Sequence, residues 1–183
     1  MVIMKLKTFP LVYFLFFITV SPVLASHPPV HHELTVILDP SQSIAKFYDV
    51  ITIPKNIVHS ITSFQLNKNS KIERLELSGS KISTEDSGDG FLKFDLPQPS
   101  EGLTDPLKLV CIYTLPLPFS DENMETLFIS GADYFYPQPV MRDKITYRVT
   151  FQIKIQTPKS LKAISQGEKL KETLENGNRT VIW

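Results

Sequence analysis

Residues 145–156 read ITYRVTFQIKIQ, a run in which apolar and polar side chains alternate without a break. The apolar members, such as Val149, Phe151 and Ile153, are β-branched or aromatic. A repeat of two residues puts every apolar side chain on one face of a strand, whereas a helix would scatter them around its circumference. The run therefore predicts a long β-strand that is buried on one face only.

Similar short strands are expected along most of the chain. Residues 31–38 and 44–53 flank a short polar turn and predict a hairpin. Asn176-Gly177 is a strong hairpin signal and predicts pairing of residues 168–174 with 179–183. Further strands are expected at residues 61–66, 72–77, 91–96, 107–115, 126–129, 145–156 and 161–165. The pattern predicts an all-β fold, an antiparallel β-sandwich or saddle-like domain, with the last hairpin cut short after Trp183.

Length and composition narrow the class of protein. A chain of 183 residues corresponds to one domain, and a hydrophobic content of 42% with 12 Phe and 6 Tyr is ample for a packed core. The 19 basic and 19 acidic residues leave no net charge, so nucleic acid is not an expected partner.

The first 25 residues have the pattern of an export signal. Lys5 and Lys7 precede an apolar run at residues 11–20. Val23 and Ala25 then supply the small residues at the −3 and −1 positions, so cleavage is expected after Ala25. The apolar run is shorter than the roughly 20 residues that a membrane span needs. We therefore expect a protein exported to the periplasm or the extracellular space, without a membrane span after cleavage, whose mature domain is residues 26–183.

No catalytic or metal-binding set is evident among the reactive residue types. The single cysteine, Cys111, cannot form an internal disulfide and is expected to be a small buried hydrophobe. His27, His31 and His32 are expected to be solvated on a flexible lead-in. His32-Glu33 begins an H-E-x-x-H pattern, but Val36 occupies the place of its second histidine.

The most distinctive loop is SGADYFYPQP at residues 130–139. Two interpretations of its aromatic side chains stay open. They could form a contact with another domain or with a substrate cleft, or they could cover one end of the sandwich. The candidate residues are Gly131, Tyr134, Phe135, Tyr136 and Pro137.

Several phrases in order resemble the N-terminal β-domain of the M1 zinc aminopeptidases, the aminopeptidase N-like family. They are HHELTV at 31–36, YDVITIP at 48–54, ISGADYFYP at 129–137 and KAISQG at 162–167. The resemblance implies a saddle-shaped β-domain beside a thermolysin-like catalytic domain. It also implies that the zinc site lies in that missing domain, so that this chain carries no cofactor and no catalytic residue of its own.

The resemblance implies a non-catalytic fragment of an exported enzyme whose parent activity is removal of N-terminal residues from peptides. Its partner would be the peptidase catalytic domain, in cis if the gene is longer, or in trans. The alternative is a free-standing secreted β-sandwich that binds a partner. The abrupt ending at Trp183 favours the fragment, and the lack of a nucleophile, base or metal set places an independent enzyme third.

Overall fold

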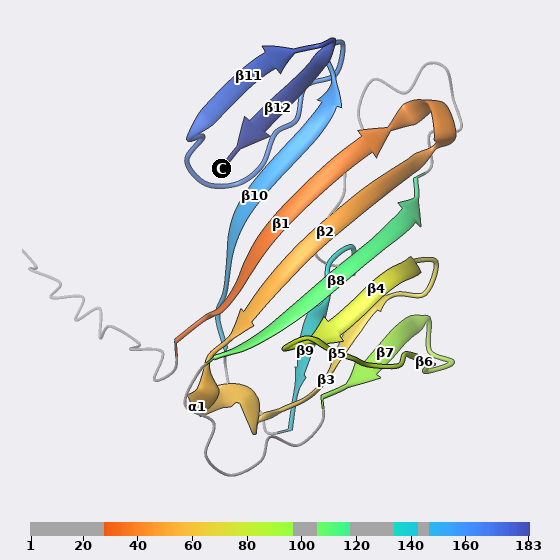
Figure 1. Ribbon diagram of the computed structural model, residues 1–183, viewed down its shortest axis with the longest axis vertical. Helices are drawn as coiled ribbons and strands as arrows, with labels where there is room; N and C mark the ends of the chain where they lie inside the picture. The colour runs from red at the N-terminus through yellow and green to blue at the C-terminus, as the bar shows by residue number, and fades with distance from the viewer. Residues whose placement is uncertain (1–27, 97–105, 118–133, 143–146) are drawn as a thin grey trace, which may run out of the picture.

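The computed structural model describes residues 28–96, 106–117, 134–142 and 147–183, and its regular structure is almost entirely β (Figure 1). The larger sheet contains β1 (Val30–Asp39), β2 (Ile44–Ile53), β4 (Lys71–Leu77), β5 (Ser80–Lys81), β8 (Leu107–Pro116), β10 (Val149–Pro158), β11 (Lys171–Glu175) and β12 (Asn178–Ile182). The smaller sheet contains β3 (Ile61–Asn67), β6 (Glu85–Asp86), β7 (Phe91–Asp95) and β9 (Gln138–Met141). The expected all-β fold, rich in antiparallel pairs, is confirmed.

The strand order of the larger sheet is β11-β12-β10-β1-β2-β8-β4-β5, and that of the smaller is β6-β7-β3-β9. One pair departs from the antiparallel expectation, because β1 and β10 run parallel. His31 lies beside Thr150 in that pair, 119 positions later in the chain. A parallel pair needs a long crossover connection rather than a turn, so no local signal in the sequence announces it.

Strand bounds follow the sequence pattern closely in some places and not in others. β2 occupies the expected residues, and β10 keeps the expected alternation of burial but begins at Val149. The expected strand at residues 161–165 is wrong, since Leu161 instead closes a turn by donating its N–H to the Pro158 carbonyl. The expected strand at residues 126–129 lies outside the described residues.

Five short elements were not expected from the sequence. They are the one-turn helix α1 (Lys55–Val58), the 3-10 turn η1 (Pro40–Gln42) and the strands β5, β6 and β9. Pro139 makes β9 a poor strand by sequence, but an edge strand tolerates proline because its outer side needs no backbone donor.

The Asn176-Gly177 hairpin forms as expected, and all of β11 pairs with β12. Asn176 and Gly177 have φ values of 49° and 78°, the left-handed backbone that a type I′ turn requires at both central positions. Trp183 still pairs with Ile153 through backbone hydrogen bonds of 2.9 and 3.1 Å. That the hairpin is cut short after Trp183 stays a prediction.

The core fills the space between the two sheets. Alternate residues of β1, β2 and β8 point inward, and Phe47 of β2 stacks on Tyr113 of β8 with ring centroids 4.8 Å apart. From the smaller sheet, Phe64 and Phe94 form a second stacked pair at 5.6 Å. Buried aromatic pairs of this kind add specific geometry to the burial of apolar area.

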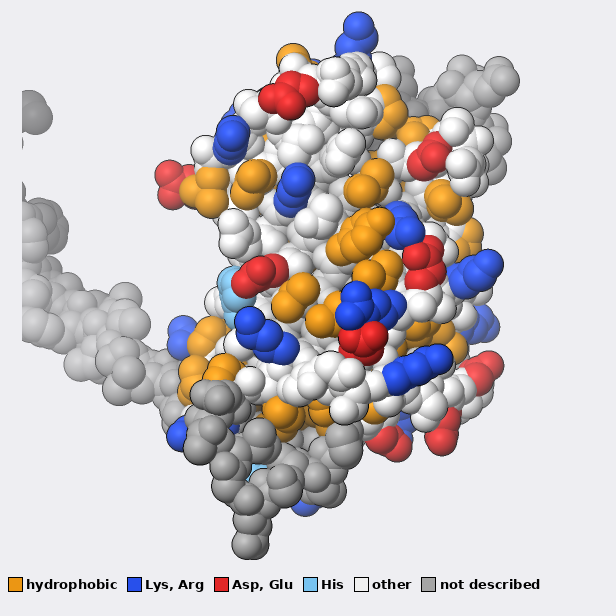
Figure 2. Space-filling model, in the orientation of Figure 1, with side chains coloured by type: hydrophobic (Ala, Val, Ile, Leu, Met, Phe, Trp, Pro, Cys, Tyr) orange, Lys and Arg blue, Asp and Glu red, His pale blue; other side chains and the backbone are white. Residues whose placement is uncertain are grey.

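The face of the molecule seen in Figure 2 is mixed, with apolar, basic and acidic side chains interspersed. Exposed ion pairs join Lys46 to Glu73 at 2.8 Å and Arg74 to Glu76 at 2.7 Å. Such surface pairs contribute little to stability, so the fold depends on its core. Among the described residues, no helix has the length and apolar content needed to cross a bilayer.

Candidate functional site

The described part of the aromatic loop, residues 134–137, leads into β9 and packs against the molecule rather than extending from it. Tyr134 has a left-handed backbone (φ 51°), and its carbonyl accepts the Asn67 N–H at 2.9 Å. Its ring lies 4.2 Å from that of Phe91, centroid to centroid. Pro137 is buried, whereas Gly131 and the expected cleavage residue Ala25 lie outside the described residues.

Phe135 and Tyr136 connect this segment to the core. The Tyr113 hydroxyl donates to the Phe135 carbonyl at 2.6 Å, and the Phe135 ring lies 6.2 Å from that of Phe47. Tyr136 meets the His32 ring edge-on, with a centroid separation of 5.3 Å and an angle of 79°. Both aromatic side chains are half-buried, so part of each remains available at the surface.

Beneath Tyr136 lies a buried polar pair, His32 of β1 and Asp49 of β2. The His32 Nδ1 and Asp49 Oδ2 atoms are 2.8 Å apart, and the two residues are 0% and 1% exposed. Phe151 stacks on the imidazole at 4.9 Å and also meets the Tyr136 ring edge-on at 4.9 Å, so the three rings form one cluster. The expectation that His32 is solvated on a flexible lead-in is therefore wrong, because β1 starts at Val30 and carries His32 into the interior.

A signal for this pair is present in the sequence. His32 is in phase with Leu34 and Val36, and Asp49 is in phase with Phe47 and Ile51. A polar residue in phase with a buried apolar row points inward and needs a partner there. The two strands were predicted from the sequence, but the burial of their polar residues His32 and Asp49 was not.

The other histidines do not join this cluster. His31 faces outward and its Nδ1 lies 2.9 Å from the Thr150 hydroxyl, His59 is exposed at the end of α1, and His27 lies outside the described residues. Within the described ranges, no three His, Cys, Asp or Glu side chains come together as a possible metal site. His32-Glu33 lies in the strand β1, whereas the H-E-x-x-H pattern needs a helix that carries its two histidines on one face.

Electrostatics around the pair are dominated by burial. Desolvation raises the pKa of Asp49, although its hydrogen bond to His32 acts in the opposite direction. Burial, with the Asp49 charge nearby, also raises the pKa of Tyr113 and of Tyr136. The His32 Nε2 and Asp49 Oδ1 atoms have no hydrogen-bond partner among the described residues. A closed pair of this kind joins β1 to β2 and is not reachable by a substrate.

The raised pKa of Asp49 predicts a pH dependence of stability. Its ordinary pKa is 3.8, and the folded protein retains the proton above that value while the unfolded chain has released it. The contribution of Asp49 protonation to the free energy of unfolding is thus fully present below pH 3.8. It is lost as pH rises through the pKa of Asp49 in the folded protein. As pH rises above 3.8, we expect the free energy of unfolding of the native protein to fall relative to that of the Asp49→Asn variant. The fall is at most about 1.4 kcal/mol per pH unit. Urea titrations of both proteins between about pH 3 and pH 8 measure this difference, and a constant difference would contradict it.

Cys111 is the register partner of Asp49 on β8 and is fully buried. Burial, with the nearby Asp49 charge, raises the pKa of its thiol, so the reactive thiolate is suppressed. We expect a thiol reagent to leave the native protein unmodified and to modify its single cysteine once in denaturant. Rapid stoichiometric labelling of the native protein would show that the interior around Cys111 is open.

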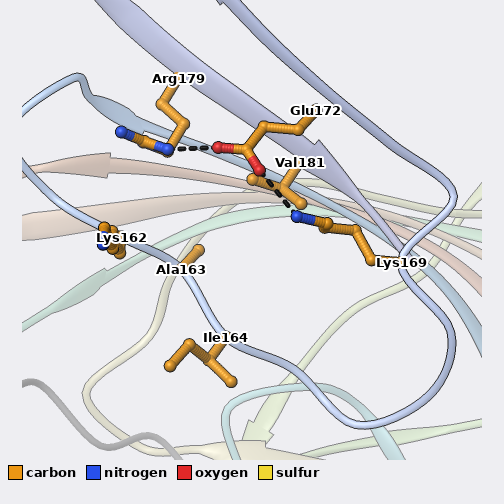
Figure 3. A pocket seen from close by; sticks show the side chains of 7 residues that line it. All are labelled: Lys162, Ala163, Ile164, Lys169, Glu172, Arg179 and Val181. Carbon is orange, nitrogen blue, oxygen red and sulfur yellow. Dashed lines mark hydrogen bonds and ion pairs between the residues drawn. The ribbon is translucent and has the colours of Figure 1, made fainter.

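A shallow hollow lies elsewhere, between β11, β12 and the segment that connects β10 to β11 (Figure 3). Its volume is about 340 Å³, and its lining residues are Lys162, Ala163, Ile164, Lys169, Glu172, Arg179 and Val181. Glu172 forms ion pairs with Arg179 and, at 2.9 Å, with Lys169. None of these residues was a site candidate on sequence grounds.

Comparison with known proteins gives one kind of match. No family model and no curated protein matches the chain. The crystal structure of the M1 zinc metallopeptidase from Deinococcus radiodurans matches with a TM-score of 0.56 at 16% identity, over 85% of this chain and 38% of that one. A mutant of that enzyme bound to a Tyr-Ser-Ala substrate matches with a TM-score of 0.56 at 17% identity, with the same coverage.

A two-domain M1 zinc metallopeptidase mutant bound to L-tryptophan also matches, with a TM-score of 0.57 at 17% identity. This match also covers 85% of the present chain and 38% of the enzyme chain. The present chain thus spans well under half of the enzymes that it matches. Its described residues have the fold of one part of the M1 zinc metallopeptidases.

Proposed function

We propose that this chain is the non-catalytic N-terminal β-domain of an exported M1-type zinc aminopeptidase. The observation that supports this most directly is the unequal coverage of the structural matches, 85% of this chain against 38% of the M1 zinc metallopeptidase. A part of an enzyme that has its own hydrophobic core is typically a separate domain. In this proposal, it packs beside the catalytic domain. The parent activity in this proposal is removal of N-terminal residues from peptides, and the chain alone is inactive.

In this proposal, zinc is bound by the catalytic domain. The aromatic loop, including Gly131 and residues 134–137, contacts that domain near its substrate cleft. Support comes from the way the segment is held, since the Tyr113 hydroxyl fixes Phe135 and the His32 ring supports Tyr136 from below. A contact surface that is fixed before binding loses less conformational entropy on association.

The first test is the size of the natural product in its own host, detected with an antibody against residues 145–156. The proposal expects a product much larger than 20.8 kDa, with an N-terminus at Ser26 if export follows cleavage after Ala25. A product at or below 20.8 kDa would contradict a domain in cis. The full-length product should release amino acids from peptides, whereas the purified 183-residue chain should not, and should retain no zinc after dialysis.

A free-standing binding module is the second candidate. It is favoured by three exposed apolar side chains near the hollow, Ile164, Leu170 and Leu174, which are 90%, 63% and 60% exposed. Apolar side chains gathered at one place on a surface often mark an interaction site. A short exported product would support this candidate, so the same measurement separates the two.

A further inference from the structure

β11 is the outermost strand of the larger sheet, and no described strand pairs with its outer side (Figure 1). An edge strand presents unpaired backbone N–H and C=O groups that can pair with another chain. The opposite edge of this sheet, β5, contains only two residues, whereas β11 contains five. β11 is also flanked by the exposed Leu170 and contains the exposed Leu174.

The phase of the hydrogen bonds identifies which residues of β11 face outward. Trp183 and Ile153 exchange two backbone hydrogen bonds, so Trp183 faces β10. Alternate residues of a strand direct their backbone groups to opposite sides, so the preceding residue, Ile182, faces β11 and pairs with its first residue. The second and fourth residues of β11, Glu172 and Leu174, therefore direct their N–H and C=O groups to the free edge.

We propose that this edge pairs with the same edge of a second copy of the chain, antiparallel about a two-fold axis at Thr173. In this register, Glu172 of each copy lies opposite Leu174 of the other, and these are the residues whose backbone groups face outward. They exchange reciprocal hydrogen bonds, while Thr173 faces Thr173 as a non-hydrogen-bonded pair. Lys171 of each copy lies opposite Glu175 of the other.

Charge complementarity favours a second copy as the partner. The strand reads KETLE, and the two-fold register matches the cation at its start with the anion at its end, twice. Opposite charges across an antiparallel pair are favourable, and so are facing threonines. Glu172 is already ion-paired with Lys169 and Arg179 within its own copy, so facing Leu174 leaves no unpaired charge.

The apolar side chains of the edge are covered by the same arrangement. Leu174 lies on the face of β11 that carries Glu172, and in the proposed register the two Leu174 side chains become diagonal neighbours. At 60% exposure in one copy, Leu174 has apolar surface left to bury there. An interface made by one short strand is small, so the dimer should be weak and dependent on concentration. This inference does not depend on the proposed function.

The test is sedimentation equilibrium of the purified chain over a range of concentrations. The native protein should show a reversible monomer–dimer equilibrium. Lys171→Glu places Glu opposite Glu and should weaken the association constant about tenfold, and Glu175→Lys should do the same by placing Lys opposite Lys. An equimolar mixture of the two variants restores opposite charges and should form a heterodimer of roughly native affinity.

Lys55→Glu is the matched control, because Lys55 is exposed on α1, outside the larger sheet. It should leave the equilibrium unchanged, and circular dichroism spectra should show that all variants are folded. A native chain that stays monomeric at every concentration would overturn the proposal. So would a dimer that is insensitive to both charge reversals, or variants that fail to pair with each other when mixed.

Discussion

Phe47→Ala should lower the free energy of unfolding by about 4 kcal/mol, the usual scale for removing a large aromatic side chain from a core. Phe47 is fully buried, stacks on Tyr113 at 4.8 Å with nearly parallel rings, and contacts Phe135 of the aromatic segment. The truncation leaves a cavity between the sheets, because rigid strands on both sides cannot close over the missing ring. Urea unfolding followed by circular dichroism measures the loss.

Tyr48→Ala is the matched control, because Tyr48 is the next residue of β2 and points to the outer face with 36% exposure. Its loss should be well under half that of Phe47→Ala, since less apolar area leaves a buried environment. Equal losses at the two positions would contradict the assignment of inner and outer faces of β2. A loss below about 1 kcal/mol at Phe47 would contradict the packing between the sheets.

Asp49→Ala should cost about 3 kcal/mol, for a different reason. The change removes the partner of His32 Nδ1 and leaves a buried imidazole whose Nε2 already has no partner among the described residues. A buried polar group left without its partner retains the full cost of desolvation. The loss is therefore expected to exceed what the 2.8 Å hydrogen bond itself contributes.

A double variant separates the contribution of the hydrogen bond from the cost of leaving the buried imidazole without a partner. His32→Leu with Asp49→Val removes both polar groups, and it should recover most of the stability that Asp49→Ala loses, because apolar replacements of similar size suit a buried pair. Glu33→Ala is the control, since Glu33 is exposed on the other face of β1. A double variant no more stable than Asp49→Ala would mean that the pair contributes beyond satisfying its own polar groups.

The strands were largely predictable from the sequence because their causes are local. β2 lies where its alternation and its flanking turns placed it, and the Asn176-Gly177 turn joins β11 to β12 as expected. A turn that needs two left-handed residues selects Asn-Gly by sterics alone. Alternation likewise needs no knowledge of the rest of the chain, since it reflects only which side of each strand is buried.

The candidate site was less predictable. The aromatic segment was identified by its composition, but its position against Tyr113 and His32 depends on strands far apart in the sequence. His32 was assigned to solvent together with His27 and His31, because nothing local in the sequence requires a histidine near the N-terminus to be buried. Its partner Asp49 lies 17 positions away on another strand, and only the pairing of β1 with β2 brings the two together.

Periodicity in the residues alone thus determined that this is a β protein, and it indicated the alternation of more buried and more exposed residues along β10. The neighbours of each strand were decided only by the tertiary structure, since the parallel pairing of β1 with β10 and the proline-containing β9 have no local signature. The physical reason is the range of the interactions. Turn sterics and side-chain alternation act over a few residues, whereas strand pairing and the burial of His32 against Asp49 and Tyr136 are selected by the packing of the whole core.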